Sequence, residues 1–172
     1  IITSDTGELT WNMERTDAGY WTVNTNNTKL FTGFPDARII DLGGIKLEIG
    51  DTRLGWATVS FVSQNATGFG ESGNPANILL AATGLMENKG MAIQKTSQTK
   101  IKLTDWGDGP IYVEGIPAKI TLLSSAQKTK CYSLDNVGNR KKEVPVVKVN
   151  ENTSEIVIDP KYKTVWYEIE IK

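Results

Sequence analysis

The stretch GIKLEIG at residues 44–50 carries the clearest evidence for the fold. Three apolar residues, Ile45, Leu47 and Ile49, alternate with a lysine and a glutamate between two flanking glycines. Successive side chains of a β-strand point to opposite faces, so this pattern predicts a strand with an apolar inner face and a polar outer face. An amphipathic helix would instead repeat its apolar residues at spacings of three and four.

Similar short runs follow one another along the chain, separated by clusters of Gly, Asn, Asp and Ser. The run at 77–84 is apolar on both faces and fits a buried strand or a short helix; we expect a strand, because it is brief and ends at Gly84. Gly138 is expected to supply a tight hairpin turn within 135–142. Further strands are expected at 8–13, 20–24, 55–63, 101–106, 111–116, 119–124, 130–135, 144–149, 155–159 and 165–171.

The expected fold class is therefore an all-β antiparallel sandwich, of jelly-roll or immunoglobulin-like type. A small C-terminal sheet extension remains an option. The 172 residues suffice for one domain with a sizeable core. The alternation of charged and β-branched residues changes at Pro117, so two sub-parts, 1–117 and 118–172, are an option. No linker separates them, and we expect one compact unit.

Charge and composition exclude several classes of protein. The formal net charge is -1 and the pI is about 5.6, so no basic field is available to hold nucleic acid or an anionic membrane. No apolar stretch is long enough for a membrane span. Cys131 is the single cysteine, which excludes an internal disulfide. The sequence begins with Ile1 instead of Met, which is expected for a segment excised from a longer protein. We also expect the protein to be a monomer.

The absence of histidine excludes most catalytic chemistry. With no histidine, Ser-His-Asp and Cys-His nucleophile systems and the usual zinc sites are all missing. The 20 Asp and Glu residues are scattered, with no pair spaced as a motif. We therefore expect a protein that is not an enzyme by itself.

Several motifs, in order along nearly the whole chain, resemble one known type of module. The resemblance is to the β-sandwich module that follows the catalytic barrel in a group of secreted bacterial (clostridial-type) glycoside hydrolases. The stretches that carry it are SDTGELTWN (4–12), TVNTNNTKLFTGF (22–34), WATVSFVS (56–63), ILLAATGLMENKGM (78–91), GPIYVEGI (109–116), YSLDNVGNRKKEVPV (132–146) and TVWYEI (164–169).

The resemblance implies an ancillary module of a secreted polysaccharide-degrading enzyme, similar to a carbohydrate-binding module. Its partners would be a polysaccharide or oligosaccharide and the attached catalytic domain. The chain departs from the family pattern at Asn26-Asn27, where the family usually has Pro-Arg, and in the loop 63–74. If those loops form the functional surface, specificity differs from that of the relatives or is absent.

Sugars present an apolar C–H face and a polar rim, so proteins bind them with aromatic platforms flanked by hydrogen-bonding groups. Trp11 and Trp21 share faces with apolar residues, so both are expected in the core. Trp56 and Trp166 share faces with polar residues and are candidate platforms, although Trp166 also suits cover by a loop or docking on a partner domain. The remaining candidates for sugar binding are Tyr20 and, within the loop 104–110, Trp106, Asp105 and Asp108. Trp106 equally suits a structural role in which it fills the end of the sandwich.

A calcium site is a weaker expectation. Calcium takes oxygen ligands from carboxylates and carbonyls, and the SDTGE stretch offers Asp5 and Glu8. Neither SDTGE nor the DWGD stretch at 105–108 has the regular spacing of a dedicated calcium loop, and Asp-Gly turns also arise for backbone reasons alone. No other cofactor is expected.

Two functional alternatives remain open. The first is a non-catalytic carbohydrate-binding module that binds plant cell-wall polysaccharide weakly through exposed aromatic side chains. The second is a purely structural module that packs against its own catalytic domain without binding sugar. A binding module needs an open patch with a Trp and polar neighbours, whereas a docking module needs a broad apolar patch.

Overall fold

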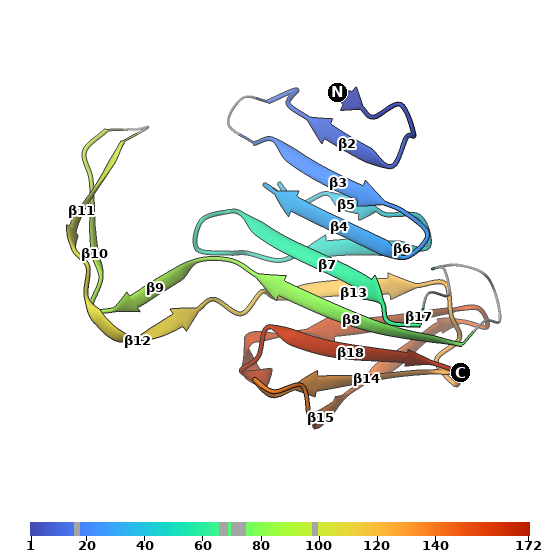
Figure 1. Ribbon diagram of the computed structural model, residues 1–172. Helices are drawn as coiled ribbons and strands as arrows, with labels where there is room; N and C mark the ends of the chain where they lie inside the picture. Colours follow the sequence, from blue (N-terminus) through green and yellow to red (C-terminus); the bar gives the residue numbers. More distant parts are fainter. Residues whose placement is uncertain (16–17, 66–68, 70–74, 98–99) are drawn as a thin grey trace.

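The computed structural model describes residues 1–15, 18–65, 69, 75–97 and 100–172, and most of the loop 63–74 lies outside this part of the chain. The fold is all-β and antiparallel, as the sequence predicts. Two large sheets face each other, and a two-stranded arm projects from them (Figure 1). The described residues contain no helix with the length and apolarity of a membrane span.

The larger sheet has nine strands and runs across the full height of the molecule (Figure 1). Every adjacent pair in it is antiparallel. In spatial order its strands are β1 (Ile2–Thr3), β2 (Leu9–Asn12), β3 (Tyr20–Asn24), β4 (Thr28–Gly33), β7 (Ala57–Ser63), β8 (Ala76–Thr83), β18 (Trp166–Ile171), β14 (Thr129–Leu134) and β15 (Arg140–Val144).

The smaller sheet has five strands and packs on the larger one. A short 3-10 helix, η1 (Pro160–Tyr162), leads from β17 toward β18. Both sheets combine strands from before and after Pro117. In the smaller sheet β13 (Ala118–Leu122) lies between β6 (Ile45–Ile49) and β17 (Thr153–Ile158), and in the larger sheet β18 lies beside β8. The order of this sheet is β16 (Val146–Asn150), β17 (Thr153–Ile158), β13 (Ala118–Leu122), β6 (Ile45–Ile49) and β5 (Ile39–Asp41).

The core lies between the two sheets and follows the predicted alternation. In the GIKLEIG strand, the three apolar side chains are buried and Lys46 is exposed. Ala57, Val59 and Phe61 of β7 are fully buried opposite them in the larger sheet. Full burial of a Leu, Ile or Phe side chain stabilises a fold by about 1.5–3 kcal/mol, so these central strands supply most of the driving force.

The stretch 77–84 forms a strand, β8, and not a helix. Its inward residues Ile78 and Leu80 are buried, and its outward residues Leu79 and Ala81 are half-buried between neighbouring strands. This central position in the larger sheet explains why both faces of the stretch are apolar. Gly138, with φ 89°, closes the predicted turn between β14 and β15.

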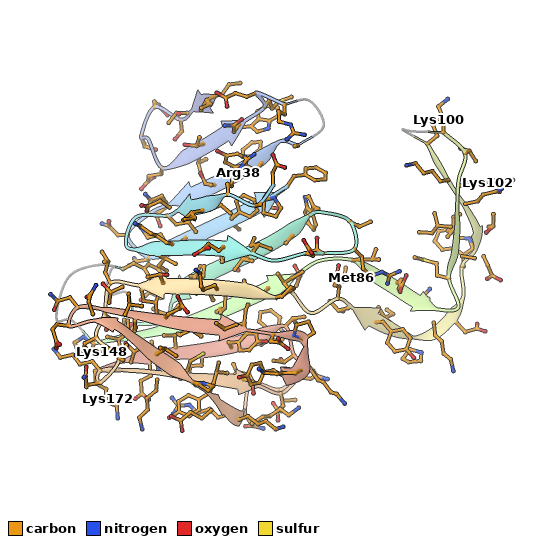
Figure 2. The ribbon with its side chains drawn as sticks, turned by 180° about the vertical axis from the view of Figure 1, so that it is seen from behind. Arg38, Met86, Lys100, Lys102, Lys148 and Lys172 are labelled. Carbon is orange, nitrogen blue, oxygen red and sulfur yellow. The ribbon has the colours of Figure 1, made fainter. Side chains whose placement is uncertain are left out.

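The arm is a long hairpin between β8 and β13, and it bends once (Figure 1). Its base pairs β9 (Met86–Lys89) with β12 (Asp108–Val113), and its distal half pairs β10 (Ala92–Lys95) with β11 (Ile101–Asp105). Figure 2 shows Met86 near the base, and Lys100 and Lys102 toward the far end.

The base of the arm is fixed to the sandwich. The Glu114 carboxylate accepts hydrogen bonds from the backbone N–H of Arg53 at 2.7 Å and of Leu85 at 3.2 Å. The Arg53 guanidinium also pairs with Glu87 of β9. These contacts hold both strands of the arm to the loop that precedes β7.

We expect the Cys131 thiol to be inert in the folded protein. Its side chain is fully buried, and burial raises its pKa to about 12. Because the thiolate is the reactive form, a disulfide reagent at pH 8 should modify Cys131 only when the sandwich opens. The modification rate should therefore rise with denaturant in step with unfolding measured by tryptophan fluorescence. Rapid and complete modification in native buffer would show that β14 is not buried.

Candidate functional site

One end of the sandwich, here called the arm end, gathers the candidate residues. The strand register fixes it, because Gly33 at the end of β4 pairs with Ala57 at the start of β7, and the next residue, Thr58, pairs with Thr83 at the end of β8. The arm leaves the sandwich directly after Thr83. Strands β3 and β18 also begin at this end.

All five tryptophans lie at the arm end or on the arm. Trp11 and Trp21 are direct partners on β2 and β3, in the register row of Thr32, Thr58 and Thr83. The others are Trp56 just before β7, Trp106 on the arm and Trp166 at the start of β18.

Trp11 and Trp21 are not core residues, which corrects the prediction from the sequence. Their rings stack with centroids 5.0 Å apart and planes at 22°, and Trp21 is 44% exposed. Leu9 and Met13, which share their face, are exposed as well. Alternation identifies an apolar face but not the side on which a second layer packs. Here the stack lies on the outer face, away from the smaller sheet.

A strip of short side chains separates this stack from Trp166. The register places Leu30, Ser60 and Ala81 in the row of Trp166, and Leu30 of β4 is larger than the other two. We define the small-residue strip as the residues Thr32, Thr58, Ser60, Ala81 and Thr83, which lie on β4, β7 and β8. Four strand spacings of about 4.8 Å and two residues along the strand separate Trp21 from Trp166, which gives a distance of about 20 Å.

Hydroxyl groups dominate the small-residue strip. Thr32 Oγ1 and Thr58 Oγ1 are hydrogen-bonded to each other at 2.6 Å across β4 and β7. A hydroxyl can donate one hydrogen bond and accept two, so these groups keep capacity for a ligand. The strip is therefore a floor of hydrogen-bonding groups between aromatic side chains.

Trp166 is 40% exposed, so no described segment of the chain covers it fully. Beyond it on the same face, Glu168 of β18 accepts two hydrogen bonds from Arg140, at 2.6 and 2.8 Å. The Arg140 guanidinium lies 4.2 Å from the centre of the Tyr132 ring. These hydrogen bonds from Arg140 lower the pKa of the Glu168 carboxyl group. The polar residues predicted beside Trp166 thus form an ordered charged cluster.

Trp106 occupies the bend of the arm and is 74% exposed. Its carbonyl oxygen accepts a hydrogen bond from the Asn88 amide at 3.0 Å. Gly107 follows with φ +63°, and a Cβ there would overlap the backbone of Lys89 and Met91. Asp105 accepts the Gly107 N–H at 2.8 Å, and Asp108 begins β12. Of the loop predicted at 104–110, only Trp106 and Gly107 lie outside β11 and β12, and they form a corner at which Gly107 leaves no room for a Cβ.

Trp56 and Tyr20 are both half-buried. The Trp56 carbonyl oxygen accepts a hydrogen bond from the Thr52 hydroxyl at 3.1 Å. Tyr20 packs against the core residue Phe31 with centroids 5.6 Å apart, and the Arg38 guanidinium lies 4.8 Å from its ring centre. The predicted candidates therefore do not share one surface: Trp166 lies on the outer face, Trp106 on the arm and Tyr20 beneath Arg38.

A hollow that sequence reasoning missed opens at the same end, close to Tyr20. Its volume is about 420 Å³, and its lining includes Arg15, Asp36 and Asp51. These residues are far apart in the sequence and have no motif spacing, so no signal in the sequence could have grouped them.

The calcium prediction finds no support in the described residues, where no three Asp, Glu or Cys side chains gather as a metal site. Near the predicted ligands, the Glu8 carboxylate accepts a hydrogen bond from Thr6 at 3.3 Å. Asp5 and Glu8 are both exposed.

Comparison of the chain with protein-family models, with curated proteins and with solved structures found no match. The resemblance described above therefore stays an expectation.

The pKa shift of Glu168 predicts a pH-dependent contribution to stability. A carboxyl group whose pKa is lower in the folded state stabilises the fold above its unfolded pKa, and this contribution is lost as the pH falls through the folded pKa. Glu168→Gln should lower the free energy of unfolding by about 0.5–1 kcal/mol at pH 7, as for a well-aligned surface ion pair. In urea denaturation, the difference from wild type should shrink below pH 4.5.

Glu143→Gln on β15 is the matched control, because the Glu143 side chain is exposed and forms no hydrogen bond or ion pair within the described residues. This substitution should leave the free energy of unfolding nearly unchanged, both at pH 7 and below pH 4.5. An equal effect of the two substitutions would show that the Arg140–Glu168 pair does not contribute.

Proposed function

We propose that this protein is a non-catalytic module that binds polysaccharide on the outer face of its larger sheet. The observation that supports this most directly is the placement of Trp21 and Trp166, both exposed, on either side of the small-residue strip. We further propose that the module serves a secreted polysaccharide-degrading enzyme, as the resemblance implies.

The arrangement matches the chemistry of a glycan chain. Stacked aromatic rings offer an apolar surface to the C–H face of a sugar, and the threonine and serine hydroxyls can bond to its hydroxyl rim. The separation of Trp21 and Trp166 is one that several linked pyranose rings would span. A chain lying across the strands would meet one platform at each end and the hydroxyl floor between them.

The expected affinity is low. Two aromatic platforms at about 1 kcal/mol each, with a few hydrogen bonds at a similar net value, give a total near -4 kcal/mol, which corresponds to a dissociation constant of about 1 mM. Weak binding suits a module attached to an enzyme, because each contact adds to the effective concentration of the catalytic domain at its substrate.

Affinity electrophoresis tests the proposal directly. The isolated module should be retarded in a native gel that contains one of xylan, xyloglucan, mixed-linkage glucan, mannan or pectin. Trp21→Ala and Trp166→Ala should each weaken the retardation about fivefold or more, because each loses one platform of about 1 kcal/mol. Trp106→Ala is the matched control, since Trp106 lies on the arm and away from the strip.

Retardation lost only in Trp106→Ala would move the sugar site to the arm. Unretarded migration of the wild type in every gel would reject the proposal. The fold of each variant can be checked by near-ultraviolet circular dichroism.

A second candidate function, docking on an attached catalytic domain, is favoured by the apolar surface of the arm. Met86, Ile111 and Val113 share one face of the arm base, and Met86 and Ile111 are 63% and 67% exposed. A two-stranded ribbon is only marginally stable in water unless a third strand pairs with it or another element packs on its apolar face. A partner that covers this face would stabilise the ribbon.

If the arm docks on the catalytic domain, the double variant Met86→Ser/Ile111→Ser should bind that domain more weakly than the wild type does. The module and the catalytic domain would be produced as separate proteins for this measurement. The loss of two buried apolar side chains should weaken binding at least tenfold in isothermal titration calorimetry. Val147→Ser, an exposed position on β16, is the control and should bind like wild type. Equal binding of all variants would exclude the arm as the contact.

A further inference from the structure

The hollow at the arm end is bounded by segments from both sheets. Phe34 and the turn after it follow β4 of the larger sheet, and Asp51 and Thr52 follow β6 of the smaller sheet. The nearly buried residues Ala18 and Ile49 lie in its lining. Its volume of about 420 Å³ is in the range of sites for small ligands, about 300–1,000 Å³. We call it the Asp36–Asp51 hollow.

The turn that carries Asp36 has an unusual backbone. Asp36 and Ala37 have φ values of 50° and 54°, and the Arg38 N–H bonds to the Pro35 carbonyl oxygen at 3.1 Å. Two successive left-handed residues within such a closed turn normally require Asn or Gly, so Ala37 is held against its preference. Residues held in such conformations occur often at ligand sites, where the surrounding structure fixes them.

Ion pairs fix the Asp36 carboxylate in place. Asp36 Oδ2 accepts from the Arg15 guanidinium at 2.5 Å and from the Arg38 guanidinium at 3.3 Å. Arg38 is held in turn over the Tyr20 ring, and the Tyr20 hydroxyl accepts a hydrogen bond from Asn12 at 3.2 Å. Among the described residues, none donates a hydrogen bond to Asp36 Oδ1, so this oxygen remains an acceptor.

The chemistry of the lining selects a neutral polyhydroxylated ligand. The Asp51 carboxylate has no hydrogen-bond partner among the described residues and offers a second acceptor in the same lining. Two carboxylates, Asp36 and Asp51, and the Arg15 guanidinium lie in the lining, and Arg38 pairs with Asp36 from outside it, so the described lining does not favour an anion. Phe34 supplies an apolar wall for C–H groups.

We propose that the Asp36–Asp51 hollow binds a single neutral pyranose ring at the end of a glycan chain. Hydroxyl groups of the ring would donate to Asp36 Oδ1 and to Asp51, and its apolar face would contact Phe34. Because buried core residues lie in the lining, the hollow suits a chain end, whereas the small-residue strip suits the interior of a chain. The inference rests on the proposed function for the class of ligand but concerns a separate site.

A titration followed by nuclear magnetic resonance tests the hollow. Glucose, mannose, galactose, xylose and the disaccharides cellobiose, xylobiose and mannobiose are each added to the ¹⁵N-labelled module at millimolar concentrations. With one of them, backbone amide shifts should concentrate at residues 34–37 and 50–55. Asp51→Ala should weaken this binding at least tenfold, since a hydrogen bond to a charged group is lost.

Glu143→Ala on β15 is the matched control and should bind the sugar like wild type, since Glu143 is exposed and far along the larger sheet from the hollow. Trp166→Ala should also leave these shifts unchanged, because the two sites are separate. Shifts at residues 34–37 and 50–55 that persist in Asp51→Ala would overturn the assigned contacts.

The two proposals can fail separately. If polysaccharide gels retard the module and Trp166→Ala abolishes this, yet no sugar shifts the amides of the hollow, the chain-end site is rejected and the proposed function stands. If sugars shift the hollow and Asp51→Ala removes the effect, the chain-end site stands even when Trp166→Ala changes nothing. If neither gels nor sugars show binding, both proposals are rejected.

Discussion

A five-stranded sheet packs against a nine-stranded one, and this mismatch determines where the apolar side chains of the larger sheet can go. Five strands cannot cover nine, so only the inner face of the central strands is sealed. Phe31, Phe61 and Leu80 therefore reach full burial. On the outermost strands β2 and β3, in contrast, Thr22 and Tyr20 take the inner-face positions, and the apolar Leu9 and Trp21 lie on the outer face. No second sheet packs on that outer face, so these side chains stay exposed.

The arm end also joins features that lie far apart in the sequence. The loop between β6 and β7 supplies Asp51 and Thr52 to the hollow, and its Arg53 holds the base of the arm through Glu87 and Glu114. A change in this loop would therefore affect the hollow and the arm together. The small-residue strip lies on the rigid centre of the larger sheet and is less sensitive to it. The strip is therefore held by paired strands, whereas the hollow is held by loops, which vary more easily.

The sequence predicts the fold well where the burial contrast along a strand is strong, as in GIKLEIG or in β17 and β18. It fails to find β1, β4 and β5, and in β4 the apolar pattern is broken by Lys29 on the inner face. It also fails to find β9, β10 and β15, because MENK, AIQK and RKKEV lack a regular apolar face and are largely exposed. These strands are defined by hydrogen bonding to neighbours and not by burial. β10 and β15 pair with their sequence neighbours β11 and β14 in hairpins, and β9 pairs with β12 at the base of the arm.

Side-chain direction was predictable only up to a choice between two faces. Lys29 illustrates the limit: it shares the inner face of β4 with Phe31, is almost fully buried, and bonds to Asn24. Burial lowers the pKa of its ammonium group, so the fold accepts a cost at this position. Trp21 illustrates the converse, with an aromatic ring placed outward beside apolar neighbours. Both departures lie on β3 and β4, near the border of the area that the smaller sheet covers.

The proposed sugar site lies on the outer face of the larger sheet, where no second sheet packs. Side chains in the sealed centre cannot reach a ligand, and side chains on an isolated edge lack the support to hold a fixed geometry. On the outer face, Trp21 is supported by its stack with Trp11, and Trp166 lies two residues before Glu168 of the Arg140–Glu168 pair. The stack fixes the exposed Trp21 ring, as the proposed sugar contact requires. Such preorganisation matters most for weak ligands such as sugars, because ordering two flexible tryptophans would offset most of the free energy that stacking supplies.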